Sequence, residues 1–553
     1  MIEIKDRKLE GKRESVSKGY EAWDIRDLID ERIKSAPDKV LYTFNDKQTG
    51  DRVEIMPAQF KEDSQAMTAW LCEQGYRRRH IAIIGDNSYA WVVAMFGILG
   101  SDNVLVAIDK GLSEEEIGEL LSFSDCDIAF YAEMCAEKVE PLKDKLNLTL
   151  YKLDIRKQIE EGRKLLSGGK DEYLKLKIDT EAPAVILFTS GTTGKRKGVV
   201  LSQKTLIVNS VLDNENARFF HDVILLLPFN HCFGLNTANI PHLLSGRTIH
   251  INSGIRYLYR DLVNENPEGL LIVPAILENL YFTMWKKIKE NGREEAVQKK
   301  IDENRKNPHL TLEQKREMFR EELSIFGNRL RTIYTGGAAQ NVRFRDGFGD
   351  FGIEVLEGYG ITECSPVITN QPSGLWKPQS VGRIIPGIEV KIDKPDANME
   401  GEICVKGPIV MLGYYKNEEA TKEAVTDGWF HTGDMGYLDS DNYLYITGRK
   451  NNLIILSNGE NVSPEELETQ LTENPLIKEV VVYAKDNKIA AQIFPDQEYA
   501  AQEKIDDVQG VIKDYVAECN LKNTNYKQIS VVEFRETPFL RTSSQKIKRD
   551  SVE

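Results

Sequence analysis

The segment 189–198, Thr-Ser-Gly-Thr-Thr-Gly-Lys-Arg-Lys-Gly, combines the residue types that bind an anion. Its glycines free the backbone to bend, so successive N–H groups can point into one concavity. The hydroxyl groups of the segment add hydrogen-bond donors, and Lys195, Arg196 and Lys197 add positive charge. This composition is typical of a polyphosphate site. The alternative is a polar, flexible hairpin turn, because short motifs also arise by chance.

This loop differs from the Walker A phosphate loop. In Walker A, the lysine is followed by a Ser or Thr that binds the metal, whereas Gly194 and Lys195 are followed by Arg196. An apolar run at 184–188 precedes the loop, and another apolar pair, at 199–200, follows it. We therefore expect a buried strand before the loop.

A second cluster, 357–363, reads Glu-Gly-Tyr-Gly-Ile-Thr-Glu and follows the apolar run 353–356. We expect it at the end of a strand. Its two glycines allow close approach of a flat ligand, on which the tyrosine can stack. Thr362 offers a hydroxyl, and Glu363 offers the hard oxygen ligand that Mg²⁺ on phosphates prefers. Taken alone, the cluster is also compatible with an ordinary turn.

Two further clusters follow along the chain. Residues 428–434, Gly-Trp-Phe-His-Thr-Gly-Asp, precede 446–449, Ile-Thr-Gly-Arg. An acidic residue at a strand end, here Asp434, is the usual partner of ribose hydroxyls, and Arg449 can bridge to phosphate. The alternatives are a turn residue and a surface ion pair. The last cluster, 540–549, places a lysine in a basic tail, where a lysine is ordinarily solvated.

The elements that must position these clusters alternate between short apolar runs and helical patterns, as in α/β folds. A helix is expected over 113–123, because Ser113 and Glu116 form a capping-box pattern. The stretch 286–322 is rich in both charges and predicts solvated helices, with an inward stripe that overlaps its start. Strands are predicted at 80–84, 103–108, 223–227, 248–251, 270–273 and 330–334, and the inward stripe consists of Leu280, Met284 and Ile288.

Composition narrows the class of protein. A chain of 553 residues suggests about three or four domain-sized units, and its net charge of −15 argues against a nucleic-acid partner. Its seven cysteines form no close pair of the zinc or redox type, as in a reduced, cytoplasmic protein. The N-terminus is too charged for a signal peptide, and the longest apolar run, 90–100, is too short to span a bilayer. We expect a cytoplasmic protein without transmembrane segments, with peripheral membrane contact left open.

Taken in order, the four clusters resemble the adenylate-forming, AMP-binding superfamily of acyl-CoA synthetases, firefly luciferase and peptide-synthetase adenylation domains. The resemblance extends from about residue 20 to the end of the chain. It implies an α/β fold with a large N-terminal AMP-binding domain of layered sheets, 1–448, a hinge, 449–451, and a small mobile α+β lid, 452–553. Five more segments carry the resemblance: 227–235, 334–339, 380–387, 401–408 and 457–464.

The resemblance implies a two-step reaction. A carboxylate attacks the α-phosphorus of ATP, giving an acyl-adenylate and pyrophosphate, and a thiol then attacks the acyl carbon and releases AMP. The cofactors implied are ATP, Mg²⁺ and coenzyme A, or the phosphopantetheine of an acyl carrier protein. Positioning and charge neutralisation dominate such a first step.

The resemblance also assigns roles to residues, and the lid lysine is the central one. Lys546 would bridge the carboxylate and the α-phosphate, which Thr362 would contact, and Glu363 would hold Mg²⁺. The β- and γ-phosphates would bind Thr189, Ser190, Gly191, Thr192, Thr193, Gly194 and Lys197. The nucleotide site would also include Gly336, Gly337, Ala338, Glu357, Gly358, Tyr359, Gly360, Asp434 and Arg449. The acyl pocket would contain His231, Phe233, Gly234 and Gly336, the thiol side Asn458, Gly459 and Glu460, and the hinge Asn451.

Four residues depart from the family pattern without removing a charged catalytic group. Arg196 stands where proline is usual, Gln203 where histidine often follows the loop, and Gln545 where glycine usually precedes the lysine. Asn451 stands at the hinge, where Asp or Lys is usual. These departures leave the loop geometry and the hinge open.

The acyl substrate is predicted to be a fatty acid. Amino-acid-activating relatives carry an aspartate near 227–235, where this chain has Asn230 and His231. The motif 273–280, the charged insertion after it and the C-terminal ending resemble bacterial long-chain fatty acyl-CoA ligases. Three alternatives stay open: an acyl carrier protein as acceptor, an aryl or other carboxylic acid as substrate, and a non-catalytic nucleotide-binding relative. The last is disfavoured by the intact set Lys197, Glu363, Asp434, Arg449 and Lys546.

Overall fold

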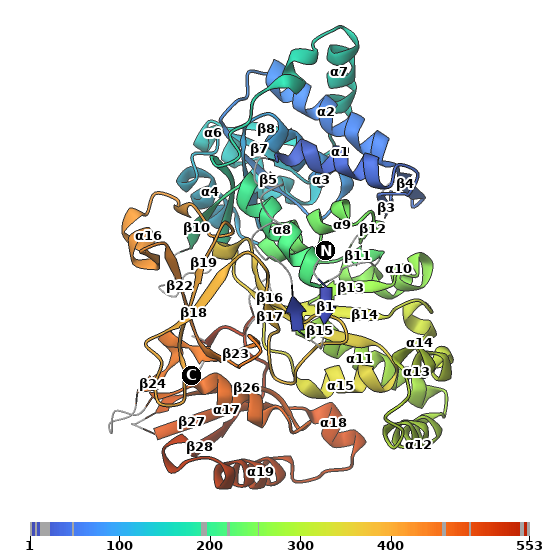
Figure 1. Ribbon diagram of the computed structural model, residues 1–553, viewed down its shortest axis with the longest axis vertical. Helices are drawn as coiled ribbons and strands as arrows, with labels where there is room; N and C mark the ends of the chain where they lie inside the picture. Colours follow the sequence, from blue (N-terminus) through green and yellow to red (C-terminus); the bar gives the residue numbers. More distant parts are fainter. Residues whose placement is uncertain are drawn as a thin grey trace.

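The computed structural model describes residues 3–5, 8–10, 23–46, 49–189, 196–217, 222–252, 254–455, 461–485, 488–541 and 547–549. It has a large α/β domain and a smaller C-terminal domain, which lies at the bottom of Figure 1. The predicted fold class is therefore confirmed. Two large sheets and a third, smaller one form the large domain.

The first large sheet is parallel through its centre and antiparallel at one edge. Its central strands are continuous apolar runs because helices cover both faces, so that both sides of each strand are buried. The antiparallel edge carries the predicted phosphate loop. The order is β20 (Gly413–Tyr414), β10 (Lys197–Ser202), β9 (Pro183–Thr189), β6 (Val104–Ile108), β5 (His80–Ile84), β7 (Ile128–Tyr131) and β8 (Thr149–Lys152).

The second large sheet presents two neighbouring parallel strands, β14 and β15, to the predicted nucleotide site. Strand β16 pairs antiparallel with β15 and extends it. The order is β17 (Arg383–Ile384), β16 (Val367–Asn370), β15 (Glu354–Gly360), β14 (Thr332–Gly336), β13 (Gly269–Ile272), β11 (Val223–Leu225), β12 (Ile249–Ile251), β3 (Tyr42–Asn45) and β4 (Arg52–Ile55).

The helices of the large domain begin with recognisable signals. Helix α4 has the predicted capping box, because Ser113 accepts from the Glu116 N–H while Glu116 accepts from the Ser113 N–H. Helices α2 and α11 begin with proline, which suits a first helical position. The helices are α1 (Ile25–Ser35), α2 (Pro57–Glu73), α3 (Tyr89–Gly100), α4 (Glu114–Phe123), α5 (Ala136–Val139), α6 (Leu142–Leu146), α7 (Arg156–Ser167), α8 (Gln203–Ala217), α9 (Ile240–Leu244), α10 (Leu258–Glu265), α11 (Pro274–Glu290), α12 (Glu294–Arg305), α13 (Leu312–Met318), α14 (Arg320–Leu323), α15 (Val342–Asp350) and α16 (Glu418–Ala424).

The third sheet leads into the small domain. It contains β18 (Glu389–Asp393), β19 (Gly401–Lys406), β22 (Trp429–Leu438), β21 (Val425–Thr426) and β23 (Leu444–Arg449). After β23 the chain makes a 3-10 turn, η7 (Lys450–Asn452), and enters the small domain, which has a hydrophobic core of its own. That domain contains β24 (Ile454–Ile455), β25 (Asn461–Val462), α17 (Pro464–Leu471), β26 (Ile477–Lys485), β27 (Lys488–Pro495), α18 (Gln497–Gln502), α19 (Val508–Lys522) and β28 (Ile529–Phe534). A short hairpin of β1 (Glu3–Lys5) and β2 (Lys8–Glu10) precedes the large domain.

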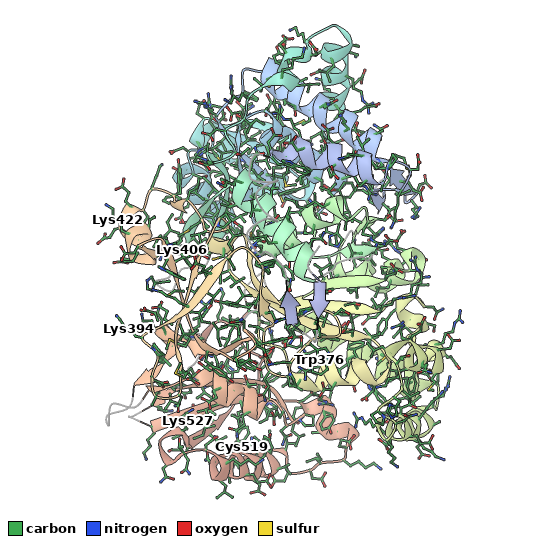
Figure 2. The ribbon with its side chains drawn as sticks, in the orientation of Figure 1. Trp376, Lys394, Lys406, Lys422, Cys519 and Lys527 are labelled. Carbon is green, nitrogen blue, oxygen red and sulfur yellow. The ribbon has the colours of Figure 1, made fainter. Side chains whose placement is uncertain are left out.

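Most predicted elements are confirmed, with ends that shift by one to a few residues. The strand at 80–84 coincides with β5, and the charged stretch 286–322 folds into the end of α11 and into α12, α13 and α14. The predicted stripe on α11 is buried. All seven cysteines are free, including Cys519 on α19 of the small domain (Figure 2). In the described part of the chain, no helix is both long and apolar enough to cross a membrane.

Candidate functional site

The predicted phosphate loop connects two antiparallel strands at the sheet edge. Thr189 at the end of β9 pairs with Lys197 at the start of β10. The residues between them that were assigned to the phosphates (Ser190, Gly191, Thr192, Thr193 and Gly194) lie outside the described residues, as do Asn458, Gly459, Glu460, Gln545 and Lys546. The pairing of β9 with β10 therefore fixes both ends of the loop and places Lys197 directly after it.

Two of the departures from the family pattern have structural roles. The Arg196 guanidinium forms an ion pair with the Glu116 carboxylate at 3.0 Å, which joins the loop to the first turn of α4. The buried Gln203 side chain accepts from the Ile25 N–H at 2.8 Å and donates to the Leu99 carbonyl at 3.0 Å. Gln203 thus holds the start of α8 between α1 and α3, and its amide is committed to packing the large domain.

Glu363 lies next to the phosphate loop. The Tyr414 hydroxyl donates to the Glu363 carboxylate at 2.9 Å, and the Lys197 ammonium lies 4.7 Å from the centre of the Tyr414 ring. The register of β10 with β20, in which Val199 faces Tyr414, brings these groups together. Burial raises the pKa of Glu363, while the Tyr414 hydrogen bond and the charges of Arg449 and Lys197 lower it. A carboxylate among cationic and hydroxyl groups is suited to a divalent cation that is itself bound to phosphates.

Asp434 connects the predicted adenine and ribose segments. The Tyr359 hydroxyl donates to one oxygen of the Asp434 carboxylate at 2.6 Å, and the Arg449 guanidinium pairs with the other at 2.9 Å. Asp434 is 4% exposed, so this carboxylate is positioned by both partners. The pair follows from the register, because Asp434 faces Arg449 across β22 and β23. Arg449 therefore does form an ion pair, which was the alternative interpretation of this residue. Its partner, Asp434, is itself a predicted site residue.

One predicted position needs correction, because Asp434 lies inside β22 rather than at a strand end. The cluster 357–363 lies at the end of a strand as predicted, with its first four residues forming the end of β15. Pairing with a neighbouring strand extends both segments: β16 pairs with β15, and β23 pairs with β22. The side chains therefore belong to strands that are paired on both sides, and such strands hold their geometry better than turns do.

Glycines bring the acyl and nucleotide segments into contact. Gly336 and Gly358 face each other on β14 and β15. A Cβ on Gly336 would lie 3.5 Å from the Phe233 ring, so these two predicted acyl-pocket residues are neighbours. A Cβ on Gly234 or Gly360 would clash with a backbone carbonyl, which explains why glycine is needed there. Gly337 and Ala338 follow β14 and are exposed, as a ligand-lining segment requires.

The backbone of Glu357 is held by two hydrogen bonds, and the pKa of its side chain is raised. Its N–H donates to the Gln371 side chain at 3.2 Å, and its carbonyl accepts from the Gln371 N–H at 2.8 Å. Burial raises the pKa of the Glu357 carboxyl to about 7, while the charge of Arg345 lowers it. Perturbed carboxyls are enriched at functional sites, which supports the place of Glu357 in the site.

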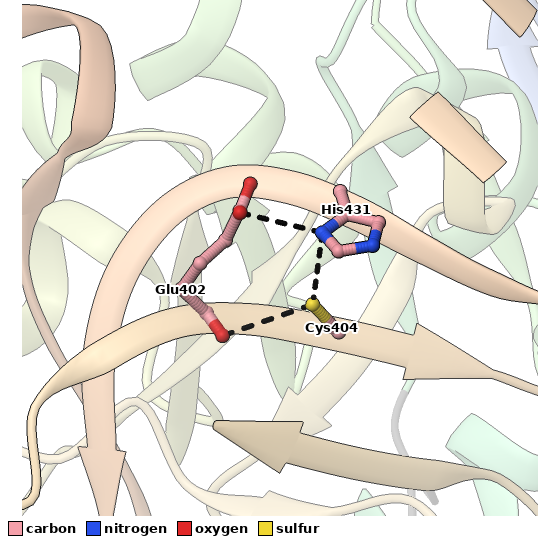
Figure 3. Close-up of side chains that lie close together, drawn as sticks. All are labelled: Glu402, Cys404 and His431. Atoms are coloured by element: carbon pink, nitrogen blue, oxygen red, sulfur yellow. Dashed lines mark hydrogen bonds and ion pairs between the residues drawn. The ribbon is translucent and has the colours of Figure 1, made fainter. Parts of the chain in front are cut away.

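A further polar cluster lies beside the predicted hinge. The His431 Nδ1 is 3.3 Å from both the Glu402 carboxylate and the Cys404 sulfur, and Figure 3 shows this arrangement. These are metal-ligating residue types, but the Lys450 ammonium already pairs with the same Glu402 oxygen at 2.8 Å. Burial raises the pKa of the Cys404 thiol to about 11, which keeps it protonated. We therefore assign this cluster to anchoring Lys450 rather than to a metal.

Sequence reasoning missed Tyr414 and Glu402. Each is recognised only through the register of its strand: Tyr414 through the pairing of β20 with β10, and Glu402 through the pairing of β19 with β22. Glu402 also accepts the Gly433 N–H at 3.2 Å, immediately before Asp434. Glu402 lies in segment 401–408, which the family resemblance already included, whereas no motif of the sequence analysis contains Tyr414.

Comparison with known proteins shows the family to which the chain belongs. A family model described as AMP-binding enzyme matches residues 29–415, and one described as AMP-binding enzyme C-terminal domain matches 451–553. The long-chain-fatty-acid–CoA ligase FadD15 of Mycobacterium bovis is 28% identical over 489 residues, which cover 83% of this chain and 80% of that protein. The chloroplastic long-chain-fatty-acid–acyl-carrier-protein ligase AEE15 of Arabidopsis thaliana is 26% identical over 572 residues, 85% of this chain and 77% of that protein.

The fold has a close counterpart among solved structures. The anthranilate CoA ligase AuaEII, crystallised with anthranoyl-AMP, superposes with a TM-score of 0.75 at 18% identity and covers 96% of each chain. Together, the family models span both domains of this protein, and the described site residues lie within the matched regions or the short stretch between them. The chain therefore belongs to the family of AMP-binding, adenylate-forming enzymes and is similar to long-chain fatty acyl-CoA ligases.

Proposed function

We propose that this protein activates a fatty acid as its acyl-adenylate with ATP and transfers the acyl group to coenzyme A. The observation that carries the proposal is the convergence of two pairs at the meeting of three sheets. Lys197 and Glu363 both contact Tyr414, one at its ring and the other at its hydroxyl, and Asp434 pairs with both Arg449 and the Tyr359 hydroxyl. This arrangement offers cations for phosphates and carboxylates for a metal and a ribose.

Each group has a distinct task in the proposed first step. Lys197 attracts the phosphates that the loop binds, and Glu363 would hold Mg²⁺, which neutralises phosphate charge when bound. Asp434 accepts hydrogen bonds from the ribose hydroxyls. The Arg449 guanidinium is half exposed and is paired with Asp434. Its remaining N–H groups can donate to a phosphate while the ion pair with Asp434 is kept. The protein thus works by holding groups in place while charge develops on the α-phosphate.

Substituting Glu363 by Gln is expected to raise sharply the Mg²⁺ concentration needed for half-maximal adenylation. Gln keeps the shape but removes the anionic oxygen that the metal prefers. Because burial raises the pKa of Glu363, protons compete with Mg²⁺, so the Mg²⁺ requirement of the parent should rise as pH falls. That pH-dependent part should be absent in E363Q. Mg²⁺ titrations at several pH values measure both effects.

Tyr414→Phe is the matched control for this experiment. It removes the hydrogen bond to Glu363 but leaves the carboxylate, so the Mg²⁺ requirement should change only a few-fold. Identical Mg²⁺ curves for E363Q and the parent would show that Glu363 is only a turn residue.

The fatty-acid assignment predicts a dependence on chain length. Each methylene buried in an apolar pocket contributes about 0.8 kcal/mol, so kcat/KM should rise about fourfold per carbon until the pocket is full. Steady-state rates for saturated acids from four to eighteen carbons, with aryl and amino acids alongside, measure this. A flat profile or a preference for aryl acids would contradict it.

The acceptor is tested separately, because one relative is an acyl-carrier-protein ligase. Adenylate formed from the best acid is offered coenzyme A or a phosphopantetheinylated acyl carrier protein, and the thioester is identified by mass spectrometry. We expect acyl-CoA as the main product. An acyl carrier protein that reacts much faster than coenzyme A would identify the protein as a carrier-protein ligase.

A further inference from the structure

The side-chain amide of Asn341 forms one hydrogen bond within the large domain and another to the small domain. It is the N-cap of α15, and its carbonyl oxygen accepts from the Arg343 N–H at 2.9 Å. Its amide nitrogen donates to the carbonyl of Thr472 at 2.9 Å. Thr472 is the C-cap of α17 in the small domain, where carbonyls have no partner within their helix. One half-buried side chain therefore joins a helix start in the large domain to a helix end in the lid.

The position of Asn341 connects this contact to the nucleotide site. It follows Gly336, Gly337 and Ala338, the segment assigned to adenine, by only a few residues, and it begins α15, which packs on β15. β15 carries Glu357 and Tyr359. The lid is thus attached to the same helix that follows the adenine segment.

Other groups show which side of the lid faces the large domain at this contact. The Arg343 guanidinium, two residues after Asn341, lies 6.0 Å from the centre of the Tyr499 ring on α18. Arg541 of the lid pairs with Glu479 at 2.6 Å and forms a β-bridge with Ile547. These two bridged residues enclose the segment that contains Lys546.

The charge of Arg541 reaches the large domain. Burial raises the pKa of the Glu278 carboxyl on α11 to about 7, and Arg541 and Arg343 lower it, whereas the like charge of Glu479 raises it further. The residues that enclose the Lys546 segment are therefore close enough to α11 and α15 to affect a buried carboxyl there. In this orientation, the side of the lid that carries Arg541 faces the large domain.

We propose that Asn341 is a positioning residue that favours the lid orientation for adenylate formation. Its amide holds Thr472, and with it the lid, in the orientation in which Arg541 lies near α11 of the large domain; the same bond breaks when the lid rotates for thioester formation. A single neutral hydrogen bond changes an equilibrium by about 3- to 10-fold, which biases the lid without locking it. This inference rests on the proposed two-step function.

Asn341→Asp separates the two roles of the side chain. Aspartate caps helices as well as asparagine does, so α15 keeps its cap, but a carboxylate has no proton for the Thr472 carbonyl. We expect kcat/KM for fatty-acid-dependent pyrophosphate exchange to fall about 3- to 10-fold. The conversion of supplied acyl-adenylate to thioester should be unchanged or faster, because that step uses the other lid orientation.

Asn417→Asp is the matched control. Asn417 caps α16 of the large domain and accepts from the Ala420 N–H at 3.0 Å, so the same substitution tests a cap alone. The ratio of the rate of adenylate formation to the rate of thioester formation should be the same in N417D as in the parent. Thermal unfolding of N341D within about 2 °C of the parent would show that the cap is intact.

One result would overturn the inference: a ratio of the two half-reaction rates in N341D equal to that of the parent, whether both rates are unchanged or both fall equally. If the parent itself gave no acid-dependent pyrophosphate exchange, the proposed function would fail, and this inference with it. Exchange in the parent with an unaltered N341D would reject the role of Asn341 alone.

Discussion

Substitution of Lys546 by alanine is expected to slow adenylate formation by about 10²–10³-fold. The family resemblance places this ammonium between the attacking carboxylate and the α-phosphate, where negative charge develops. Loss of one preorganised group at such a centre costs about 3–4 kcal/mol of transition-state stabilisation. Thioester formation from supplied acyl-adenylate should continue, because the charge that Lys546 stabilises is absent from that step. Stopped-flow or quench measurements of the two half-reactions test this separation.

Lys548→Ala is the control for this substitution. Lys548 lies two residues further along and is exposed, so it carries the same charge in the same tail. We expect K548A to retain both half-reactions. An equal loss of both half-reactions in K546A would contradict the assigned role and would indicate a folding defect instead.

Asn451→Pro is expected to reduce thioester synthesis by orders of magnitude while adenylate formation stays within several-fold of the parent. Residue 451 lies in the 3-10 turn that joins the two domains, and proline fixes φ near −65°, close to the value of such turns. The observed orientation is therefore retained, whereas a rotation that needs a large change of φ at this residue is blocked. Proline also restricts the backbone angles of the preceding residue, Lys450. This restriction explains why we expect a small decrease in the rate of adenylate formation.

Asn451→Ala is the matched control, because it removes the side chain but leaves φ free. Both half-reactions should persist in N451A. If N451P also kept thioester synthesis at the parent rate, the pivot would lie at another residue. The Lys450–Glu402 ion pair at 2.8 Å then indicates where to look, since it attaches the residue before the turn to β19.

The sequence predicted the strands of the parallel sheets well, for a physical reason. A strand covered by helices on both faces must be apolar throughout, and the run that forms β5 shows this directly. Helix α4 was equally clear, because a capping box is a local signal. Predictions that depend on neighbouring residues alone therefore succeeded.

Features that depend on pairing between distant strands could not be predicted. The 357–363 cluster contains two glycines, which favour a turn, yet pairing with β16 keeps Gly358 and Tyr359 in a strand. The bond from Tyr414 to Glu363 depends on the register of a two-residue strand about fifty positions away. Likewise, the sequence assigned Asp434 and Arg449 to one ligand but could not show that they pair with each other.

The proposed function depends on the formation of a fatty acyl-adenylate, and ATP–pyrophosphate exchange in the absence of any thiol measures that step alone. The parent enzyme is supplied with ATP, Mg²⁺, labelled pyrophosphate and a panel of fatty, aryl and amino acids. We expect label to enter ATP only when an acid is present, fastest with fatty acids, and almost no label to enter with K546A. Exchange without any acid, no exchange with any of them, or exchange driven best by an amino acid would contradict it.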